Sequence, residues 1–159
     1  LTAKPADPFK SNAYMDNGKE MEPAARELLE TRTGMPIAQV GFVKNNLLRM
    51  GCSPDGLLGA NPDNLLEFAA GVEIKCCLAD IQIERLMRGG VPSEYRAQVE
   101  GSLLVTGARV WKCYSYSTGL PAHIVDVTLT DERAHQLRTE LANFNAELDM
   151  LVATVRRMY

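Results

Sequence analysis

The spacing of apolar residues changes repeatedly along this 159-residue chain, and the order of those changes limits the folds that it can adopt. Stretches with helical spacing alternate with short apolar or alternating runs, which are separated by Gly, Pro, Asn and Asp. The predicted elements are a helix over 13–30, strands over 37–43, 46–51, 56–58 and 71–77, helices over 78–88 and 93–106, strands over 110–117 and 123–130, and a helix from 131 to the end. Short strands joined by helical crossovers indicate an α/β (α+β) domain with a mixed central β-sheet flanked by helices.

The ends of the predicted helices depend on a few residues. Pro23 is awkward in a helix interior, so the first helix either begins near Glu22 or kinks at Pro23. Ser93 is the expected N-cap of the helix over 93–106, and Asp131 is the expected cap of the last helix.

The length and charge of the chain limit its class. A chain of this length fits one domain over 1–159. It has no apolar run near the roughly 20 residues that span a bilayer and no signal peptide at its start, so we expect a cytoplasmic protein with no membrane partner. The net charge of −3 disfavours nucleic acid as a ligand. A cluster of carboxylates neutralised by bound cations would reconcile that charge with a DNA-binding face.

The four cysteines give no support for a zinc or disulfide site. Cys76 and Cys77 are adjacent, and neither Cys52 nor Cys113 completes a CxxC pair. We therefore predict small buried residues in strands and a reducing compartment. His123 and His135 match no metal spacing, and the aromatic residues of 110–117 are expected in the core.

Three charged residues near the predicted strands carry the chemistry. Asp55 lies in a Pro-Asp-Gly turn at the start of a strand. Glu73 and Lys75 are two residues apart on an apolar strand, so their side chains point to the same face of the sheet. Burying both is costly unless they pair or bind a ligand. Carboxylates from two strands form a hard oxygen site suited to Mg²⁺ or Mn²⁺, and an adjacent lysine can hold a metal-bound water.

Pro-Asp followed by Glu-x-Lys resembles the signature of the PD-(D/E)xK nuclease superfamily, which implies a restriction-endonuclease-like core. Further strings over about 11–130 resemble the family of lambda exonuclease and the YqaJ-like viral recombinases. These strings are GKEMEPAAR at 18–26, SPDGL at 53–57, EIKC at 73–76 and Tyr95-x-x-Gln98-Val99.

The resemblance implies a role for each matching residue of the metal site. Asp55 and Glu73 would ligate a first cation together with the backbone carbonyl of Ile74. Glu22 would help to bind a second cation or its waters. Lys75 would orient and activate the attacking water. Two Mg²⁺ ions roughly 3.5–4 Å apart, for which Mn²⁺ can substitute, would stabilise the attacking and leaving oxygens.

The resemblance also implies contacts to DNA. Gln98 would hydrogen-bond near the nucleophile or phosphate, and Tyr95 lies one turn before it. We further predict phosphate contacts for Arg85, Arg88 and Arg96, which lie on the two helices after the catalytic strand. A solvated helix face is the alternative for these arginines.

At the level of function, the resemblance implies a Mg²⁺-dependent exonuclease that digests double-stranded DNA, 5′ to 3′, by two-metal hydrolysis. The resulting single-stranded overhangs would serve phage-type homologous recombination. The implied assembly is a ring-shaped homotrimer around a double-stranded DNA end, with a single-strand annealing protein as partner. The implied setting is a phage or prophage protein in a bacterial host. The family's N-terminal helix and Arg…Gly-x-Thr-Ala-Ser segment have no counterpart here, so we expect that part of the fold to be missing.

Alternatives remain for each site residue. Asp55 can be a turn residue only, Glu73 and Lys75 a surface ion pair, Glu22 a helix-dipole acid, and Gln98 a solvated side chain. The competing functions are a site- or structure-specific endonuclease with the same site, or an inactivated nuclease fold kept for DNA binding.

Overall fold

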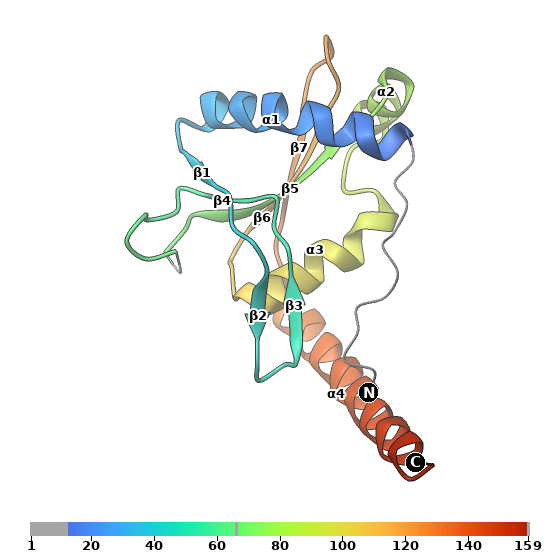
Figure 1. The fold of residues 1–159 in the computed structure, drawn as a ribbon. Coiled ribbons are helices and arrows are strands. Elements are labelled where there is room, and N and C mark those ends of the chain that lie inside the picture. The colour runs from blue at the N-terminus through green and yellow to red at the C-terminus, as the bar shows by residue number, and fades with distance from the viewer. Residues whose placement is uncertain (1–12, 66, 159) are drawn as a thin grey trace.

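The computed structural model describes residues 13–65 and 67–158. Its helices follow the predicted order, but the two strands predicted over 37–43 and 46–51 are three short strands, because residues 46–49 form a turn (Figure 1). Their bounds are α1 Ala13–Thr33, β1 Ile37–Ala38, β2 Val43–Asn45, β3 Met50–Cys52, β4 Gly56–Leu58, β5 Ala70–Cys76, α2 Ala79–Arg88, α3 Ser93–Thr106, β6 Trp111–Tyr116, β7 His123–Val127 and α4 Asp131–Arg156.

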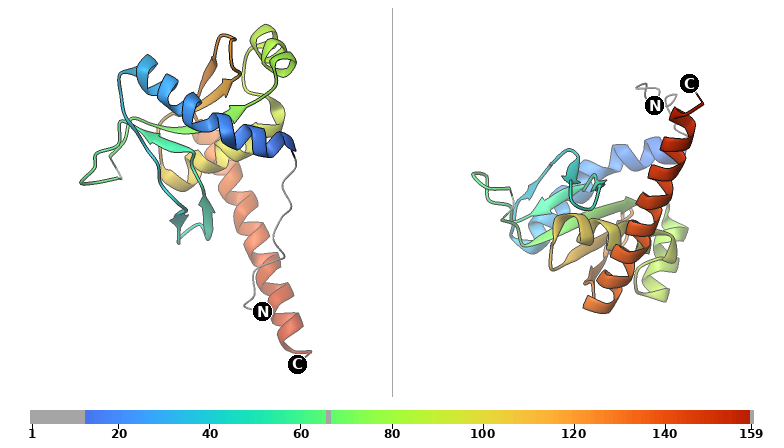
Figure 2. Two further views of the ribbon diagram at one scale, coloured as in Figure 1. Left: turned by 45° about the horizontal axis from the view of Figure 1, so that its top comes forward. Right: turned by 90° about the horizontal axis from the view of Figure 1, so that it is seen from below.

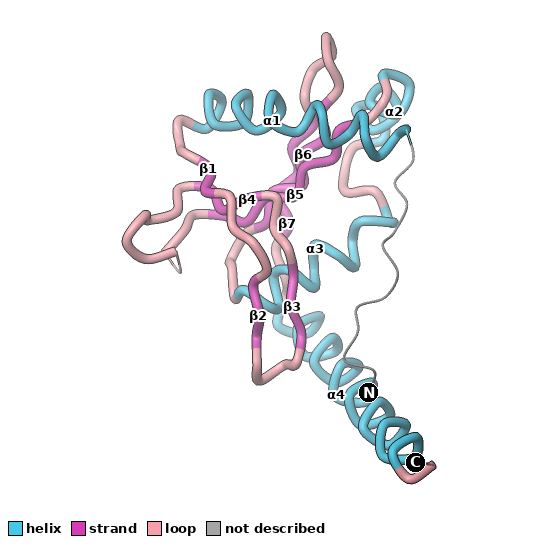
Figure 3. The backbone as a smooth tube through the Cα atoms, viewed as in Figure 1, coloured by secondary structure: helices cyan, strands magenta, loops and turns pink. Residues whose placement is uncertain are grey.

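The described residues form a five-stranded mixed sheet with the strand order β1-β4-β5-β6-β7. Strands β5 and β6 are parallel, and the other neighbours are antiparallel. A parallel pair needs a crossover connection, which α2 and α3 supply between β5 and β6. The predicted mixed sheet flanked by helices is confirmed. Strands β2 and β3 form a separate hairpin that lies beside α3 (Figure 3).

The sheet has a helix on each face, with α1 on one side and α3 on the other (Figure 1). Ala25 and Leu29 of α1 pack in one core cluster with Val72 and Ile74 of β5. A second cluster joins α3 to β6 through a short apolar set, Val99, Leu103 and Trp111. Because alternate residues of a strand point to opposite faces, Glu73 and Lys75 are directed away from α1 and toward α3.

Close packing on the α3 side requires a residue without a side chain at the start of β5. A Cβ atom at Gly71 would overlap the ring of Trp111, which is completely buried. Tyr114 of β6 is also completely buried, so the prediction that these aromatic residues pack in the core is confirmed. The strand that carries Glu73 and Lys75 is therefore fixed tightly against β6.

Two predicted N-caps, and one of the two alternatives for the first helix, are wrong. Helix α1 runs continuously from Ala13 through Pro23, so it does not begin near Glu22. The N-cap of α3 is Pro92 rather than Ser93. The N-cap of α4 is Thr130, whose side chain accepts a hydrogen bond from the Arg133 backbone N–H at 3.2 Å. In the last case the sequence placed the cap one residue late, because Thr and Asp both favour that position.

Helix α4 projects from the sheet as a long arm (Figure 2). Arg49, in the turn between β2 and β3, donates two hydrogen bonds to Asp149 at 2.7 and 2.9 Å and so joins the hairpin to this arm. All four cysteines lie in the described part of the chain, and none of them forms a disulfide. Within residues 13–65 and 67–158, no helix combines the length and apolar composition that a bilayer-spanning segment needs.

Candidate active site

Asp55 is held at the start of β4 by two hydrogen bonds to β5. Its backbone N–H donates to the carbonyl of Val72 at 3.1 Å. Its carboxylate oxygen Oδ2 accepts the backbone N–H of Ile74 at 2.7 Å. The antiparallel pairing of β4 with β5 therefore places the Asp55 carboxylate beside the segment 73–75. A residue that served only the turn would not need its side chain bonded to the next strand.

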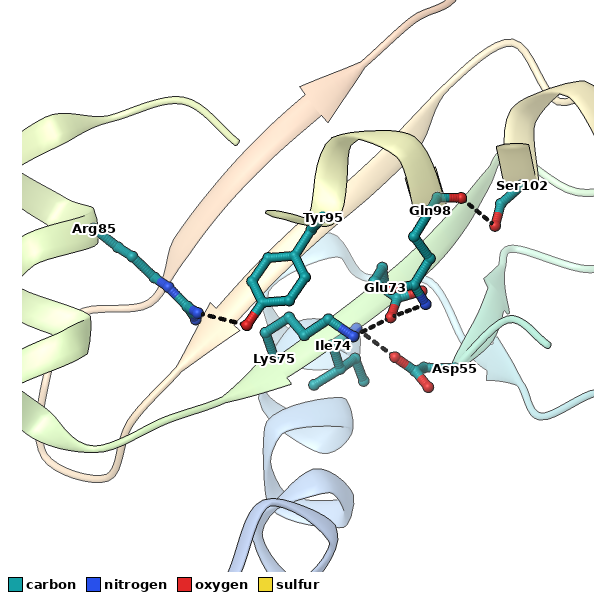
Figure 4. Close-up of polar contacts among 8 residues, drawn as sticks. All are labelled: Asp55, Glu73, Ile74, Lys75, Arg85, Tyr95, Gln98 and Ser102. Carbon is teal, nitrogen blue, oxygen red and sulfur yellow. Dashed lines mark hydrogen bonds and ion pairs between the residues drawn. The ribbon is translucent and has the colours of Figure 1, made fainter. Parts of the chain in front are cut away.

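Glu73 and Lys75 lie together on the α3 side of β5, as predicted (Figure 4). Glu73 is only 2% exposed. Its oxygen Oε1 forms an ion pair with Lys75 Nζ and accepts a hydrogen bond from Gln98 Nε2 at 2.7 Å. Its oxygen Oε2 is also buried but has no hydrogen-bond partner within the described residues. The alternative of a surface ion pair is wrong for Glu73, because the carboxylate is buried.

The charges around Asp55 raise its pKa. Burial and then the nearby Glu73 carboxylate raise the pKa of Asp55 to about 6, against the lowering effect of the Ile74 N–H and of Lys75. Burial acts to lower the pKa of Lys75, but the Glu73 and Asp55 carboxylates outweigh it and the net direction is upward. Two acids therefore share a largely buried space with one ammonium group, and a cation would relieve the repulsion between the two acids.

Glu22 lies near this group but is paired elsewhere. It forms an ion pair with Arg26, one helical turn later in α1, and Arg26 also donates to the backbone carbonyl of Asp55 at 3.3 Å. The charge of Glu22 contributes to the raised pKa of Asp55. Within the part of the chain that the structure describes, no three His, Cys, Asp or Glu residues are close enough to share one metal ion. The role of Glu22 at a second ion stays a prediction.

Tyr95 and Arg85 border the site on the side of Lys75. The ammonium of Lys75 lies 4.9 Å from the centre of the Tyr95 ring, and the guanidinium of Arg85 lies 5.3 Å from the same point. Arg85 donates one hydrogen bond to the Tyr95 hydroxyl at 3.1 Å and another to Ser115 Oγ at 2.8 Å. Ser115 is bonded in turn to the buried Gln82. Sequence reasoning missed Ser115 and Gln82, because no motif connects residues 33 positions apart.

The other two predicted arginines form ion pairs of their own, with acids on their own helices. Arg88 is exposed and pairs with Glu84 at 2.9 Å. Arg96 is exposed and lies 3.6 Å from Glu100. Their predicted phosphate contacts are therefore compatible with their exposure and stay predictions.

The arrangement can hold an oxygen-seeking cation and a water molecule. Asp55 and Glu73 supply carboxylate oxygens from two neighbouring strands, and the Ile74 carbonyl is in the same segment. Lys75 and Gln98 supply N–H donors beside them. The predicted set of Asp55, Glu73, Lys75 and Gln98 thus meets at one place, where α3 covers the end of β5.

Comparison with known proteins gives consistent matches. Residues 1–109 match the YqaJ-like viral recombinase domain. The crystal structure of LHK-Exo in complex with dAMP is similar with a TM-score of 0.81 and 29% identity, covering 94% of this chain and 75% of that chain. A structure described as an alkaline exonuclease (LHK-Exo) from Laribacter hongkongensis is similar with a TM-score of 0.80 and 28% identity over the same shares. No curated protein matches the sequence.

Proposed function

Because this chain belongs to the YqaJ-like viral recombinase family, we propose that it is a Mg²⁺-dependent exonuclease that digests double-stranded DNA from the 5′ end. The family and the alkaline exonuclease neighbours make it a nuclease of that family. The single observation that best supports metal dependence is the buried, unpartnered Oε2 atom of Glu73 beside the Asp55 carboxylate.

The residues of this site fit a divalent cation. A buried carboxylate oxygen without a donor costs free energy, and a hard cation would remove that cost. Burial and then the neighbouring Glu73 carboxylate raise the pKa of Asp55, so a negative charge is costly at the same place. We propose that Asp55, Glu73 and the Ile74 carbonyl hold one Mg²⁺, and that Glu22 supports a second. Such ions, when bound, would withdraw charge from the scissile phosphate and lower the pKa of a bound water.

The protein's own donors would then orient the reacting groups. Lys75 Nζ, held by Glu73, can donate to the attacking water and keep its lone pair directed at phosphorus. Gln98 Nε2 donates to the same Glu73 oxygen, so its carboxamide would be within reach of the nucleophile or a phosphate oxygen. Arg88 and Arg96 are exposed on α2 and α3 and would contact phosphates further from the scissile bond.

The proposed partners rest on the resemblance to the family. LHK-Exo was crystallised in complex with dAMP, and we propose that a DNA end is the substrate of this chain as well. We further propose a single-strand annealing protein as the consumer of the overhang, a ring-shaped homotrimer as the assembly, and a phage or prophage protein in a bacterial cytoplasm as the setting.

The decisive experiment compares linear and closed DNA. Linear duplex labelled at the 5′ or the 3′ end, and a covalently closed circle, are incubated with the protein and Mg²⁺. We expect release of the 5′ label, an intact circle, and loss of cleavage in Lys75→Ala. Arg138→Ala, which removes an exposed charge from α4, is the matched control and should retain activity. Cleavage of the closed circle would favour an endonuclease instead.

Metal binding is tested without turnover. Calorimetric titration with Mn²⁺ should give heat of binding for the wild-type protein and for Lys75→Ala, and little or none for Glu73→Gln. Absence of binding by the wild-type protein, together with absence of cleavage, would favour an inactivated nuclease fold.

A further inference from the structure

A chain of polar contacts runs behind the site and ends at Lys75. It begins at Gln82 on α2 and passes through Ser115 on β6 to Arg85 on α2. Arg85 bonds to Tyr95 on α3, whose ring faces Lys75 (Figure 4). We propose that Arg85 and Tyr95 are positioning residues, which fix the ammonium of Lys75 for catalysis rather than bind the substrate. This inference rests on the proposed nuclease function.

The inner end of the chain is rigid because Gln82 is completely buried and fully bonded. Its Nε2 donates to the carbonyls of Ser115 at 3.2 Å and Pro121 at 2.8 Å. Its Oε1 accepts the Ser115 hydroxyl at 2.6 Å and the Cys77 thiol at 3.4 Å. A buried amide with every group bonded holds one rotamer, since any other leaves polar atoms unpaired. Gln82 therefore orients the Ser115 hydroxyl, whose lone pair remains available to Arg85.

Arg85 transmits this orientation to Tyr95. One terminal nitrogen donates to Ser115 Oγ at 2.8 Å and the other to the Tyr95 hydroxyl at 3.1 Å. A guanidinium carries its donors in a fixed plane, so two acceptors on different elements fix its position and tilt. The hydroxyl of Tyr95 is thereby tied to β6 through Arg85. The ring cannot rotate away from Lys75 without breaking that bond.

The ring of Tyr95 limits the freedom of Lys75. Lys75 has a long side chain, and restricting its rotamers costs up to about 2 kcal/mol of conformational free energy. Glu73 attracts its ammonium from one side, and the Tyr95 ring contacts it from another at 4.9 Å. The two contacts together leave a narrow set of Nζ positions. Because misplacing a catalytic group by about 1 Å costs on the order of 10²-fold in rate, the contacts behind Tyr95 bear directly on turnover.

The same contacts argue against a phosphate contact by Arg85. Both of its terminal nitrogens already donate to protein atoms. Turning the guanidinium toward a phosphate would break these bonds and release Tyr95, because its remaining N–H donors lie in the plane that the two bonds fix. Arg88, on the same helix, has an exposed guanidinium and is better placed for DNA.

Steady-state kinetics on linear duplex DNA tests the proposal. For Arg85→Ala we expect kcat to fall roughly 10–100-fold with KM within about twofold. Arg85→Lys should not restore kcat, because one ammonium cannot donate at both positions of the fork, although it keeps the charge. Tyr95→Phe should lower kcat less than Tyr95→Leu, since the ring that faces Lys75 is retained. Arg138→Ala, which removes an exposed charge, is the matched control.

A double variant and an NMR signal separate positioning from other roles. Adding Arg85→Ala to Tyr95→Leu should cost little more than Tyr95→Leu alone, because the two residues act in series. In the metal-free protein, the Lys75 side-chain methylene signals, assigned with Lys75→Ala, should be shifted upfield by the Tyr95 ring, and Arg85→Ala should reduce that shift.

Two results would overturn the inference while leaving the proposed nuclease intact. One is a rise in KM with unchanged kcat in Arg85→Ala, restored by Arg85→Lys, which would identify a phosphate contact. The other is an unchanged Lys75 signal in Arg85→Ala. A wild-type protein that cleaves no DNA would instead contradict the proposed function itself.

Discussion

Two glutamates in the described part of the chain are almost completely buried, Glu73 on β5 and Glu100 on α3, and they are paired very differently. Glu100 Oε2 accepts from Arg133 Nε and ion-pairs with Arg133 Nη2, both at 2.9 Å, and its Oε1 lies 3.6 Å from Arg96. Both oxygens of Glu100 therefore face a cation. Glu73 has two donors on Oε1, and its Oε2 has no partner among the described residues.

The comparison distinguishes Glu100, whose carboxylate is paired within the protein, from Glu73, whose carboxylate can still bind a ligand. Burying a carboxylate costs several kcal/mol unless its oxygens are paired. Arg133 completes the pairing of Glu100 and joins α3 to the start of α4. At Glu73 the pairing is incomplete, and the nearby Asp55 adds a second acid. A site that leaves such a cost uncompensated is expected to gain the missing partner from a bound ion.

The largest expected effect is on catalysis at Glu73. Glu73→Gln keeps the shape of the side chain but removes its charge, so we expect kcat to fall by about 10³-fold, or about 4 kcal/mol in the barrier. We expect only a small change in the melting temperature in chelator, because the variant loses both the ion pair with Lys75 and the repulsion from Asp55. Single-turnover cleavage and thermal melting measure the two quantities. Glu100→Gln is the control and should cleave DNA within about twofold of the wild type. Equal cleavage rates for Glu73→Gln and Glu100→Gln would mean that the two glutamates do not differ in function.

The next effect is on stability at Glu100. Arg133→Ala leaves a buried carboxylate with only the more distant Arg96, and we expect a loss of about 2–3 kcal/mol in the free energy of unfolding. This value is below the usual cost of breaking a buried pair because Arg133 is partly exposed. Urea unfolding measures it, and kcat of the folded protein should be unchanged. A loss under about 1 kcal/mol would mean that Glu100 does not need this partner.

Much of the site around Glu73 could be predicted from the sequence. The bounds of β4 and α3 match the predicted 56–58 and 93–106, because glycine and proline interrupt the chain on either side. The shared face of Glu73 and Lys75 follows from the alternation of side chains in a strand, which requires no knowledge of the fold. The approach of Asp55 came from the order of motifs in a resembling family.

The pairing of Glu100 and the contacts of Gln82 could not be predicted, because they depend on packing between distant segments. Arg133 meets Glu100 across 33 positions, and Gln82 meets Ser115 across the same separation. Neither pair has a local pattern, since each joins two elements that only the folded chain brings together. Glu22 is different. Its partner Arg26 lies four residues later, a spacing that signals a helix ion pair and could have been used.

A smaller effect is expected at Asp55, beside Glu73, in the pH dependence of the free energy of unfolding. Asp55 has a pKa of about 6 in the folded protein, above its ordinary value of 3.8, so the folded state favours the neutral acid. The stability that this contributes is complete below pH 3.8 and is lost as the pH rises through about 6. In chelator at pH 8, Asp55→Asn should therefore be more stable than the wild type by about 2 kcal/mol.

The measurement is urea unfolding in chelator between pH 4 and pH 8. The difference between Asp55→Asn and the wild type should shrink as the pH falls and be small at pH 4, where Asp55 is neutral in the folded state and only partly ionised in the unfolded state. A difference that stays constant with pH would mean that the Asn amide stabilises the turn by itself. In that case the repulsion between Asp55 and Glu73 would not contribute to the cost of the metal-free site.

The smallest effect separates the two arginines of Glu100. Arg96 is 64% exposed at its side chain and lies 3.6 Å from the carboxylate, so Arg96→Ala should cost less than about 1 kcal/mol of stability. If its predicted phosphate contact exists, the slope of log Kd against log salt should fall by about one in the same variant. Urea unfolding and DNA binding at several salt concentrations measure the two. A stability loss as large as that of Arg133→Ala would mean that Glu100 requires both cations. Glu100 would then differ from Glu73 in the number of cationic side chains that pair with it, rather than in having no unpaired oxygen.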